Sequence, residues 1–284
     1  MKLNKNMNIL IVGLGLLGGS YAESLKKQGY KVSAITRSQS SVDFALSKGI
    51  IDYGTTEVEP ELLKNADLVV FALYPHIFTE WIRSNQHLLK SGAVITDVTG
   101  VKGFIINEMK KILPDTVDFI GGHPMAGREV GGYKSSTDTL FDNAPYILTP
   151  DSTNKPENVQ LIRDMAKYIG CREVVTTTPE EHDSIIAYTS QLMHIVAVAL
   201  CNNPLLERSS SFAGGSLQDC TRIAVINEKM WSELFVENKK HLAHRITEFQ
   251  DCLENMKQAA LSEDREELER VMRHATEQKL KWLR

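Results

Sequence analysis

The sequence contains few cysteines, and their spacing argues against the sites that cysteines most often build. Only four are present in 284 residues, Cys171, Cys201, Cys220 and Cys252, and no two of them form a CxxC pair. Zinc sites and disulfide frameworks use more closely grouped cysteines, so neither is expected. We interpret the four as reduced thiols of a cytoplasmic protein.

Long apolar runs and a strong excess of one charge are also absent. No stretch approaches the ~20 uninterrupted apolar residues of a membrane span, and the apolar run at residues 9–17 lacks the cleavage site of a signal peptide. The formal net charge of −4 argues against a general binder of nucleic acid or of anionic membranes. With 42% hydrophobic residues, the chain is expected to form a globular protein with a sizeable core.

Short apolar runs alternate with amphipathic segments over the first ~175 residues, at the spacing of βαβ units. Most runs are β-branched and lack alternation, which is typical of parallel strands buried on both faces. The expected strands lie at residues 8–12, 31–35, 67–73, 93–97, 118–122, 146–149 and 173–176, and the expected helices at 15–28, 41–48, 77–89, 101–112 and 158–169. The pattern predicts an α/β, Rossmann-like, doubly wound sheet.

The pattern becomes helical at Thr178-Pro179-Glu180-Glu181. A threonine N-cap, a proline at the first helical position and an acidic first turn predict a helix start. Further on, apolar residues recur at near-heptad spacing and predict one long helix with an apolar stripe, formed by Phe235, Leu242, Ile246, Phe249, Leu253, Met256 and Ala260. The stripe fits a subunit interface and packing within its own domain equally well.

These observations divide the chain into two expected domains. Residues 1–177 would form the dinucleotide-binding Rossmann-like domain, and residues 178–284 an all-α domain for dimerisation and substrate binding. We expect a homodimer formed through this helical domain.

A glycine-rich turn follows the first expected strand and opens the first expected helix. In Gly13-Leu14-Gly15-Leu16-Leu17-Gly18, the first glycine permits the tight turn, the second lets the backbone approach a pyrophosphate, and the third lets helix and strand pack closely. The unpaired N–H groups of the helix start favour an anion there. The sequence therefore predicts a nicotinamide dinucleotide at Gly13, Gly15, Leu16, Leu17 and Gly18, the alternative being a turn without a ligand.

The segment after the second expected strand has no carboxylate for the ribose of NAD. It reads Thr36-Arg37-Ser38-Gln39-Ser40, whereas NAD-dependent enzymes place an Asp or Glu at this point to bind the 2′-hydroxyl. Arg37 and the hydroxyls of Thr36 and Ser38 could bind a 2′-phosphate, so the sequence favours NADP over NAD. The alternative is that Arg37 is a solvated loop charge.

His123 follows an apolar strand in the segment GGHPMAG. Parallel sheets bind ligands at the carboxyl ends of their strands, and a histidine there can accept a hydroxyl proton as hydride leaves the same carbon. The alternative is a histidine with a structural hydrogen bond. Thr99 and Lys102, in the segment DVTGVK at the end of another strand, could offer a hydroxyl and a cation to the same cleft.

The helical region contributes three more candidates. Ser190 and His194 share one face of its first helix, although a polar stripe without a site has the same pattern. Arg222, in the segment TRIA, stands at a helix start and could bind a carboxylate through two hydrogen bonds, or form a salt bridge between helices. His241 and His244 lack a third ligand at suitable spacing, so no metal is expected.

Together these segments resemble the prephenate/arogenate dehydrogenase family of tyrosine biosynthesis. The resemblance runs from Gly13 to about Asn238 and is carried by GLGLLGGS, DVTGVK, FIGGHPMAGRE, LFDN, EEHD, SQLMH, TRIA, Trp231 and Asn238. It implies an oxidative decarboxylation, in which hydride passes from C4 of a cyclohexadienol to the nicotinamide. Carbon dioxide leaves C1 as the ring becomes aromatic.

The resemblance also implies roles for individual residues. His123 matches the histidine that accepts a hydrogen bond from the 4-hydroxyl of the substrate. Arg222 matches the arginine that binds a substrate carboxylate, and His194 and Ser190 match residues that line the same pocket.

Two positions depart from the family pattern. Gly100 stands where the family commonly has a serine near the catalytic histidine, and Thr99 could substitute for it from one residue earlier. Gln191 stands where the family often has a histidine. The sequence leaves prephenate and arogenate open as substrates. A hydroxyacid or imine reductase of the same plan and a non-catalytic dinucleotide sensor are the alternatives.

Overall fold

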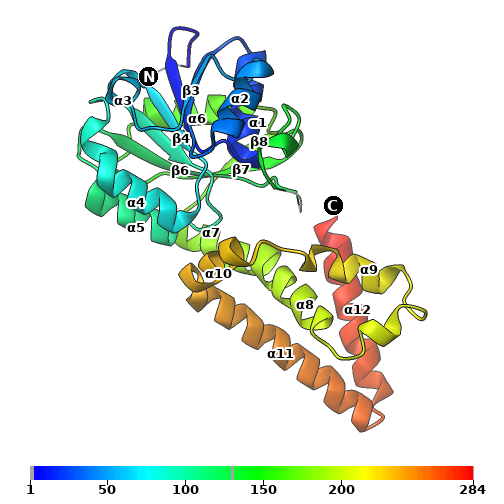
Figure 1. Ribbon diagram of the computed structural model, residues 1–284. Coiled ribbons are helices and arrows are strands. Elements are labelled where there is room, and N and C mark those ends of the chain that lie inside the picture. Colours follow the sequence, from blue (N-terminus) through cyan, green and yellow to red (C-terminus); the bar gives the residue numbers. More distant parts are fainter. Residues whose placement is uncertain (1–2, 129–130, 284) are drawn as a thin grey trace.

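The computed structural model describes residues 3–128 and 131–283. An α/β part comes first along the chain and a helical part follows it, extending away from the sheet (Figure 1). The ends of both expected domains, residues 1 and 284, lie outside the described residues, as does Glu129 of the FIGGHPMAGRE segment.

One eight-stranded sheet forms the centre of the α/β part, with the strand order β3-β2-β1-β4-β5-β6-β7-β8. The strands are β1 (Asn8–Val12), β2 (Lys31–Ile35), β3 (Tyr53–Thr55), β4 (Leu68–Phe71), β5 (Val94–Asp97), β6 (Asp118–Pro124), β7 (Pro145–Thr149) and β8 (Glu173–Thr176). Strands β1 to β6 are all parallel. Their order reverses between β1 and β4, as in the Rossmann fold, which confirms the predicted fold class.

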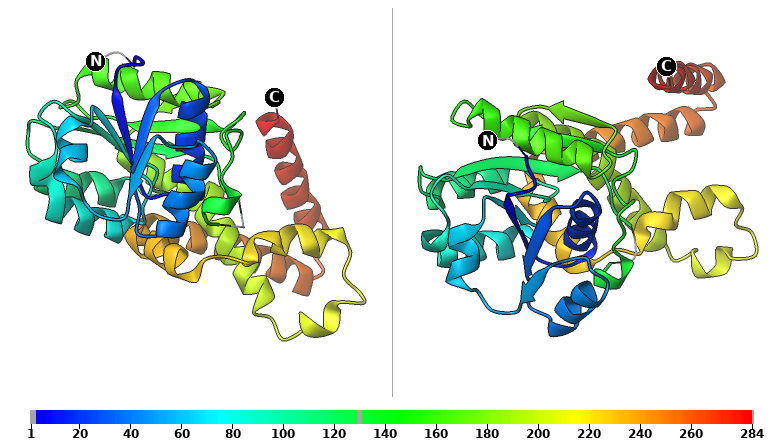
Figure 2. Two further views of the ribbon diagram at one scale, coloured as in Figure 1. Left: turned by 45° about the horizontal axis from the view of Figure 1, so that its top comes forward. Right: turned by 90° about the horizontal axis from the view of Figure 1, so that it is seen from above.

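Helices cover both faces of this sheet (Figure 2). They are α1 (Leu16–Lys27), α2 (Gln39–Ser47), α3 (Pro60–Asn65), α4 (Pro75–Asn85), α5 (Gly103–Ile112) and α6 (Pro156–Tyr168). Ile9 and Ile11 of β1 pack into one core with α1, α2 and α6, whereas Leu10 and Val12 pack into a second core with α3, α4 and α5. Burial on both faces explains why the strand lacks polar alternation.

The expectation of parallel strands is wrong for the last two strands of the sheet. Strand β7 pairs with β6 in the antiparallel direction, and β8 is parallel to β7. A parallel pair needs a crossover, usually a helix, but the connection at residues 125–144 has only a short 3-10 turn, Tyr133–Ser135, in its described portion. The chain therefore turns back along β6. Strand β3, which the sequence analysis missed, is only three residues long.

The helical part begins where the sequence predicted. The Thr178 hydroxyl accepts a hydrogen bond from the Glu181 backbone N–H at 3.1 Å and caps α7. The helices are α7 (Pro179–Ile186), α8 (Leu192–Cys201), α9 (Gly215–Thr221), α10 (Glu228–Glu237), α11 (Lys239–Leu261) and α12 (Arg265–Trp282). Between α7 and α8 the chain forms a π-helical turn, Ala187–Gln191, a feature often found at functional sites.

The predicted apolar stripe does not lie on a single helix. Phe235 belongs to α10, and the long helix α11 begins only at Lys239, because the helix is interrupted at Asn238. Within α11, Leu242 is buried but Leu253 is 51% exposed. The distal part of the stripe is therefore open to solvent in a single chain.

Other apolar residues of the helical part are also exposed. They include Tyr188, Leu205, Phe212, Val225, Leu261, Met272, Leu280 and Trp282. The continuous stretch Pro179–Cys201 is long enough to span a membrane, and an 18-residue window within it has a mean hydropathy of 1.6, with 28% of that window buried. These properties do not establish a membrane span, because helices in protein cores and interfaces share the same length and composition.

Buried amide groups join the helices of the helical part where α10 meets α11. The Asn238 amide donates to the Asp183 backbone carbonyl and to the Gln191 side-chain oxygen, both at 2.8 Å. The Gln191 amide in turn donates to the Leu234 carbonyl at 3.2 Å. Gln191, a departure from the family pattern, thus connects the π-helical turn with α10 and α11.

We expect Asn238→Ala to lower the free energy of unfolding by about 1–3 kcal/mol, because it removes a buried donor from two acceptors. Asn255→Ala, at an exposed position of α11, is the matched control and should change it by no more than about 0.5 kcal/mol. Urea unfolding at equal protein concentration measures both. Equal stabilities of the two variants would contradict the assigned role of Asn238.

Candidate active site

The glycine-rich turn between β1 and α1 is too tight for side chains at two of its positions. Gly13 has a φ of +97°, and a Cβ there would lie 2.5 Å from the Ala72 carbonyl oxygen. A Cβ on Gly18 would lie 1.8 Å from the Gly13 carbonyl oxygen. Only glycine fits at these positions, which holds the start of α1 against the end of β1.

The start of α1 is open to a ligand. Gly15 is its N-cap and supplies no side-chain hydrogen bond, and the first turn carries no acidic residue. A Cβ on Gly15 would meet no atom within 4 Å. The backbone at Gly15 and at the half-buried Leu16 and Leu17 therefore faces free space, with the unpaired N–H groups of a helix N-terminus. This arrangement fits a pyrophosphate.

The predicted ribose-binding residues lie beside this turn. The Gly13 N–H donates to the Ile35 carbonyl at 2.8 Å, so Thr36, Arg37 and Ser38 extend from the end of β2 next to it. Arg37 is exposed. The Ser38 and Ser40 hydroxyls are 2.8 Å apart and share a hydrogen bond. This local arrangement presents a cation and hydroxyls at the sheet edge.

His123 lies at the carboxyl end of β6, next to the end of β5. The adjacent Gly122 N–H donates to Asp97 Oδ1 at 3.0 Å, and a Cβ on Gly122 would lie 2.4 Å from the Tyr146 hydroxyl. The imidazole of His123 is half-buried, and its Nδ1 lies 2.9 Å from Nε2 of His182 on α7. Strand β6 of the α/β part thus contacts helix α7 of the helical part through these two histidines.

Asp183 continues this chain of contacts. Its Oδ1 lies 2.7 Å from His182 Nδ1 and accepts the Lys102 backbone N–H at 2.8 Å, while its Oδ2 accepts the Gly103 N–H at 2.8 Å. Lys102 and Gly103 form the start of α5. The carboxylate therefore satisfies N–H groups of a helix start and holds the imidazole of His182 at the same time.

Lys102 and Thr99 are buried, whereas the sequence analysis expected them to offer a cation and a hydroxyl to a ligand. The Lys102 ammonium is fully buried, with Asp97 Oδ2 at 2.5 Å and the Thr99 hydroxyl at 3.1 Å. The Thr99 hydroxyl also contacts Asp97, and Thr99 is only 5% exposed. Burial lowers the pKa of Lys102, and the Asp97 carboxylate partly offsets this. An unpaired ammonium would be very costly here, which favours the contact between Lys102 and Asp97.

The surroundings of His123 favour its neutral form. Burial lowers the pKa of His123 well below its usual value, and the neighbouring His182 and Lys102 lower it further. A charged imidazole would lose solvation and face a nearby ammonium. An imidazole with a lowered pKa keeps a lone pair that can accept a hydrogen bond.

His194 and the Arg222 segment meet on the other side of α10. His194 Nδ1 lies 3.0 Å from the Ile223 carbonyl, so this nitrogen carries the hydrogen, and the ring packs on Trp231 with centroids 3.7 Å apart. Arg222 precedes Ile223 and is exposed. Ser190 lies half-buried on the π-helical turn.

Helix α10 connects this group with His123. Leu234, one turn after Trp231, would lie 3.5 Å from a Cβ on Gly100. That Cβ would also lie 3.9 Å from Cε1 of His123. A serine at this position would therefore place its hydroxyl beside the imidazole, whereas Gly100 leaves the space open.

His182 and Asp183 are residues of this site that were not predicted from the sequence. Their signal was a histidine and a carboxylate adjacent in the EEHD helix start, but nothing in the sequence places them beside His123, 59 residues earlier. Asp97 was likewise quoted only as part of a motif. No metal site emerges either, because no cluster of three or more His, Cys, Asp or Glu suits a metal ion within residues 3–128 and 131–283.

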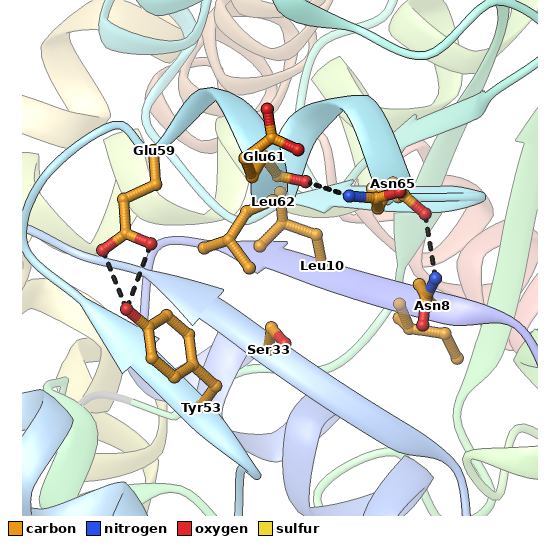
Figure 3. A pocket seen from close by; sticks show the side chains of 10 residues that line it. Asn8, Leu10, Ser33, Tyr53, Glu59, Glu61, Leu62 and Asn65 are labelled. Atoms are coloured by element: carbon orange, nitrogen blue, oxygen red, sulfur yellow. Dashed lines mark hydrogen bonds between the residues drawn. The ribbon is translucent and has the colours of Figure 1, made fainter.

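A hollow of about 320 Å³ lies elsewhere on the α/β part (Figure 3). Its lining comes from the first half of β1, from β2 and β3, and from α3, and includes Asn8, Ser33, Tyr53 and Asn65. The Tyr53 hydroxyl donates to Glu59 at 2.8 Å. Because the hollow opens beside the first residues of β1, it lies away from the carboxyl ends of the strands, where His123 and the glycine turn are found.

Comparison with known families finds matches over most of the chain. The family model described as prephenate dehydrogenase, nucleotide-binding domain, matches residues 21–175, and the model described as prephenate dehydrogenase, dimerization domain, matches residues 178–274. A prephenate dehydrogenase of Bacillus subtilis (strain 168) is 31% identical over an alignment of 278 residues that covers 94% of this chain and 74% of the relative.

Solved structures agree with these matches. Prephenate dehydrogenase from A. aeolicus, in complex with hydroxyphenyl propionate and NAD+, superposes with a TM-score of 0.89 at 31% identity, covering 99% of each chain. Synechocystis arogenate dehydrogenase superposes with a TM-score of 0.84 at 25% identity, covering 97% of this chain and all of the other. The helical part is thus matched together with the sheet.

We expect Gly15→Ala and Gly18→Ala to differ in their effects. Gly15→Ala should leave thermal stability unchanged, since its methyl meets no atom, but weaken dinucleotide binding about tenfold by occupying the space of the pyrophosphate. Gly18→Ala should lower both, because its methyl overlaps a backbone oxygen. Gly214→Ala, another open helix N-cap, is the control for Gly15→Ala. Wild-type cofactor affinity in Gly15→Ala, measured by titration calorimetry, would refute the assignment.

Proposed function

The chain belongs to the prephenate dehydrogenase family, and we propose that it converts prephenate to 4-hydroxyphenylpyruvate by oxidative decarboxylation. The family relationship makes it an oxidoreductase that uses a nicotinamide cofactor. One observation carries the proposal for this chain. The half-buried imidazole of His123, whose pKa is lowered by burial, lies at the same sheet edge as the open glycine-rich turn between β1 and α1.

The chemistry follows from what His123 can do. The nicotinamide ring, when bound, supplies the acceptor for a hydride from C4 of the substrate. His123 accepts the hydrogen bond of the 4-hydroxyl and draws its proton closer as C4 becomes electron-poor. The proton returns to the oxygen when carbon dioxide leaves C1 and the ring becomes aromatic. Prephenate and an oxidised cofactor give the product, carbon dioxide and a reduced cofactor without a net proton.

The substrate is a dianion, so its carboxylates need cationic or hydrogen-bonding partners. Arg222 is our candidate for one of them, because a guanidinium binds a carboxylate through two parallel hydrogen bonds. His194 and Ser190 are the candidates for the remaining pocket wall. We place cofactor binding in residues 1–177, and dimerisation and part of the substrate pocket in residues 178–284.

A homodimer accounts for the exposed apolar surface of the helical part. A dimerization-domain model matches residues 178–274, and this region carries the exposed Phe212 and Met272. The exposed Trp282 follows eight residues after it. Apolar side chains gathered on one part of a surface typically mark a protein–protein interface. We assign the exposed side of Pro179–Cys201 to the same subunit contact.

Oxidised cofactor with prephenate should give reduced cofactor, carbon dioxide and 4-hydroxyphenylpyruvate in equal amounts. His123→Asn should lower kcat about 10²–10⁴-fold, because the general base is lost, while cofactor affinity stays unchanged. His87→Asn, at an exposed histidine, is the control. Turnover of arogenate alone would assign the chain to the amino substrate instead. Turnover of neither compound would exclude the proposed function and leave a reductase or a dinucleotide sensor.

For the cofactor we propose a preference for NADP, supported by Arg37 and by the absence of a carboxylate at residues 36–40. Arg37→Ala should raise the KM for NADP about 10–100-fold, since a charge-assisted hydrogen bond to the 2′-phosphate is lost, and should leave the KM for NAD nearly unchanged. Lys31→Ala, at the opposite end of β2, serves as the control. An equal KM for NADP in Arg37→Ala and wild type would show that Arg37 does not bind the 2′-phosphate.

A further inference from the structure

We propose that Asp183 and His182 fix the tautomer of His123, so that Nδ1 carries the hydrogen and Nε2 keeps its lone pair for the substrate hydroxyl. His182 and Asp183 are then positioning residues, which act through His123. The role in turnover rests on the proposed function, whereas the tautomer is a property of the protein without substrate.

The direction of the hydrogen bonds starts at Asp183. Each of its carboxylate oxygens already accepts a backbone N–H from the start of α5, Lys102 at Oδ1 and Gly103 at Oδ2, both at 2.8 Å. A carboxylate held by such donors has only lone pairs to offer. The contact of 2.7 Å between Asp183 Oδ1 and His182 Nδ1 therefore requires the hydrogen on His182 Nδ1.

His182 passes this direction on to His123. The ring of His182 is buried, and burial lowers its pKa despite the adjacent carboxylate, so at neutral pH it carries one hydrogen. That hydrogen is on Nδ1, which leaves a lone pair on Nε2. His123 Nδ1 lies 2.9 Å from this lone pair, and two lone pairs at that distance would repel. His123 must donate, and its own single hydrogen is thereby placed on Nδ1.

The same logic applies to the aspartate, histidine and nucleophile of serine hydrolases, where the carboxylate selects the tautomer of the base. Here one more imidazole stands between the carboxylate and the base. Each neutral imidazole donates a hydrogen bond through one nitrogen and accepts one through the other, so all hydrogen bonds in the chain point the same way. The carboxylate of Asp183 thus determines the state of a nitrogen two side chains away.

Because Gly100 has no side chain, the hydrogen bonds from His123 to His182 and from His182 to Asp183 hold Nδ1 of His123 in place. A side chain at position 100 would lie beside the imidazole of His123, but glycine offers no hydroxyl. Thr99 does not replace it, because its hydroxyl is engaged with Asp97 and lies near the Lys102 ammonium. His182, from the helical part, supplies the hydrogen-bond acceptor instead.

Two substitutions of His182 separate this role from a purely structural one. In His182→Gln, the amide N–H can donate to Asp183 and the carbonyl can accept from His123 Nδ1, so the direction of the relay is kept. His182→Leu removes both groups at similar size. We expect His182→Leu to lower kcat at least about tenfold with the KM for the cofactor unchanged, and His182→Gln to stay within about threefold of wild type.

The tautomer itself is measured by 15N NMR of histidine-labelled protein, with His123→Asn used to assign the His123 signals. We expect a protonated Nδ1 and a free Nε2 on His123 in wild type and His182→Gln, and a mixture of both tautomers in His182→Leu. This measurement needs no turnover, so it decides the proposal even if neither prephenate nor arogenate is a substrate.

Two results would overturn the proposal. One is a His123 ring that carries its hydrogen on Nε2 in the wild-type protein. The other is a folded His182→Gln variant whose kcat falls as far as that of His182→Leu, because restoring the hydrogen-bond direction would then have no effect.

Discussion

The hydrogen bonds of the Asp183 carboxylate hold the site together, because they join three elements that are distant in the sequence. The carboxylate belongs to α7, it accepts the N–H groups at the start of α5, and it holds the imidazole that contacts His123 on β6. A buried carboxylate needs several donors to offset its desolvation. Its partners therefore fix the helical part against the sheet and, at the same time, define the surroundings of His123.

A second buried charge serves the same edge of the sheet in a different way. Lys102 and Asp97 neutralise one another below the cleft, and Asp97 also accepts the Gly122 N–H. This pair holds the ends of β5 and β6 together and adds a positive charge near His123, which helps to keep that imidazole neutral. Lys102, which the sequence suggested as a ligand-binding cation, thus affects His123 through its buried position and its charge.

Much of the α/β part could be predicted because local chemistry determines it. The strand–turn–helix at Gly13–Gly18 needs glycines at fixed positions, and the Thr178 cap needs only its immediate neighbours, so both were found. Prediction was wrong where the outcome depended on distant partners. Strand β7 runs antiparallel to β6, and the described portion of the connection between them contains no crossover helix. The break at Asn238 is stabilised by acceptors 47 and 55 residues away.

Four features could be predicted from the amino-acid sequence: the Rossmann-like sheet, the glycine-rich turn, the position of His123 at a strand end and the start of the helical part. These follow from periodicity, glycine sterics and helix capping, which act over a few residues. The burial of Lys102 and Thr99, and the contacts of His182 and Asp183 next to His123, depend instead on the packing of distant segments. Such pairings depend on which buried donors and acceptors can satisfy one another, and that is settled only when distant segments pack together.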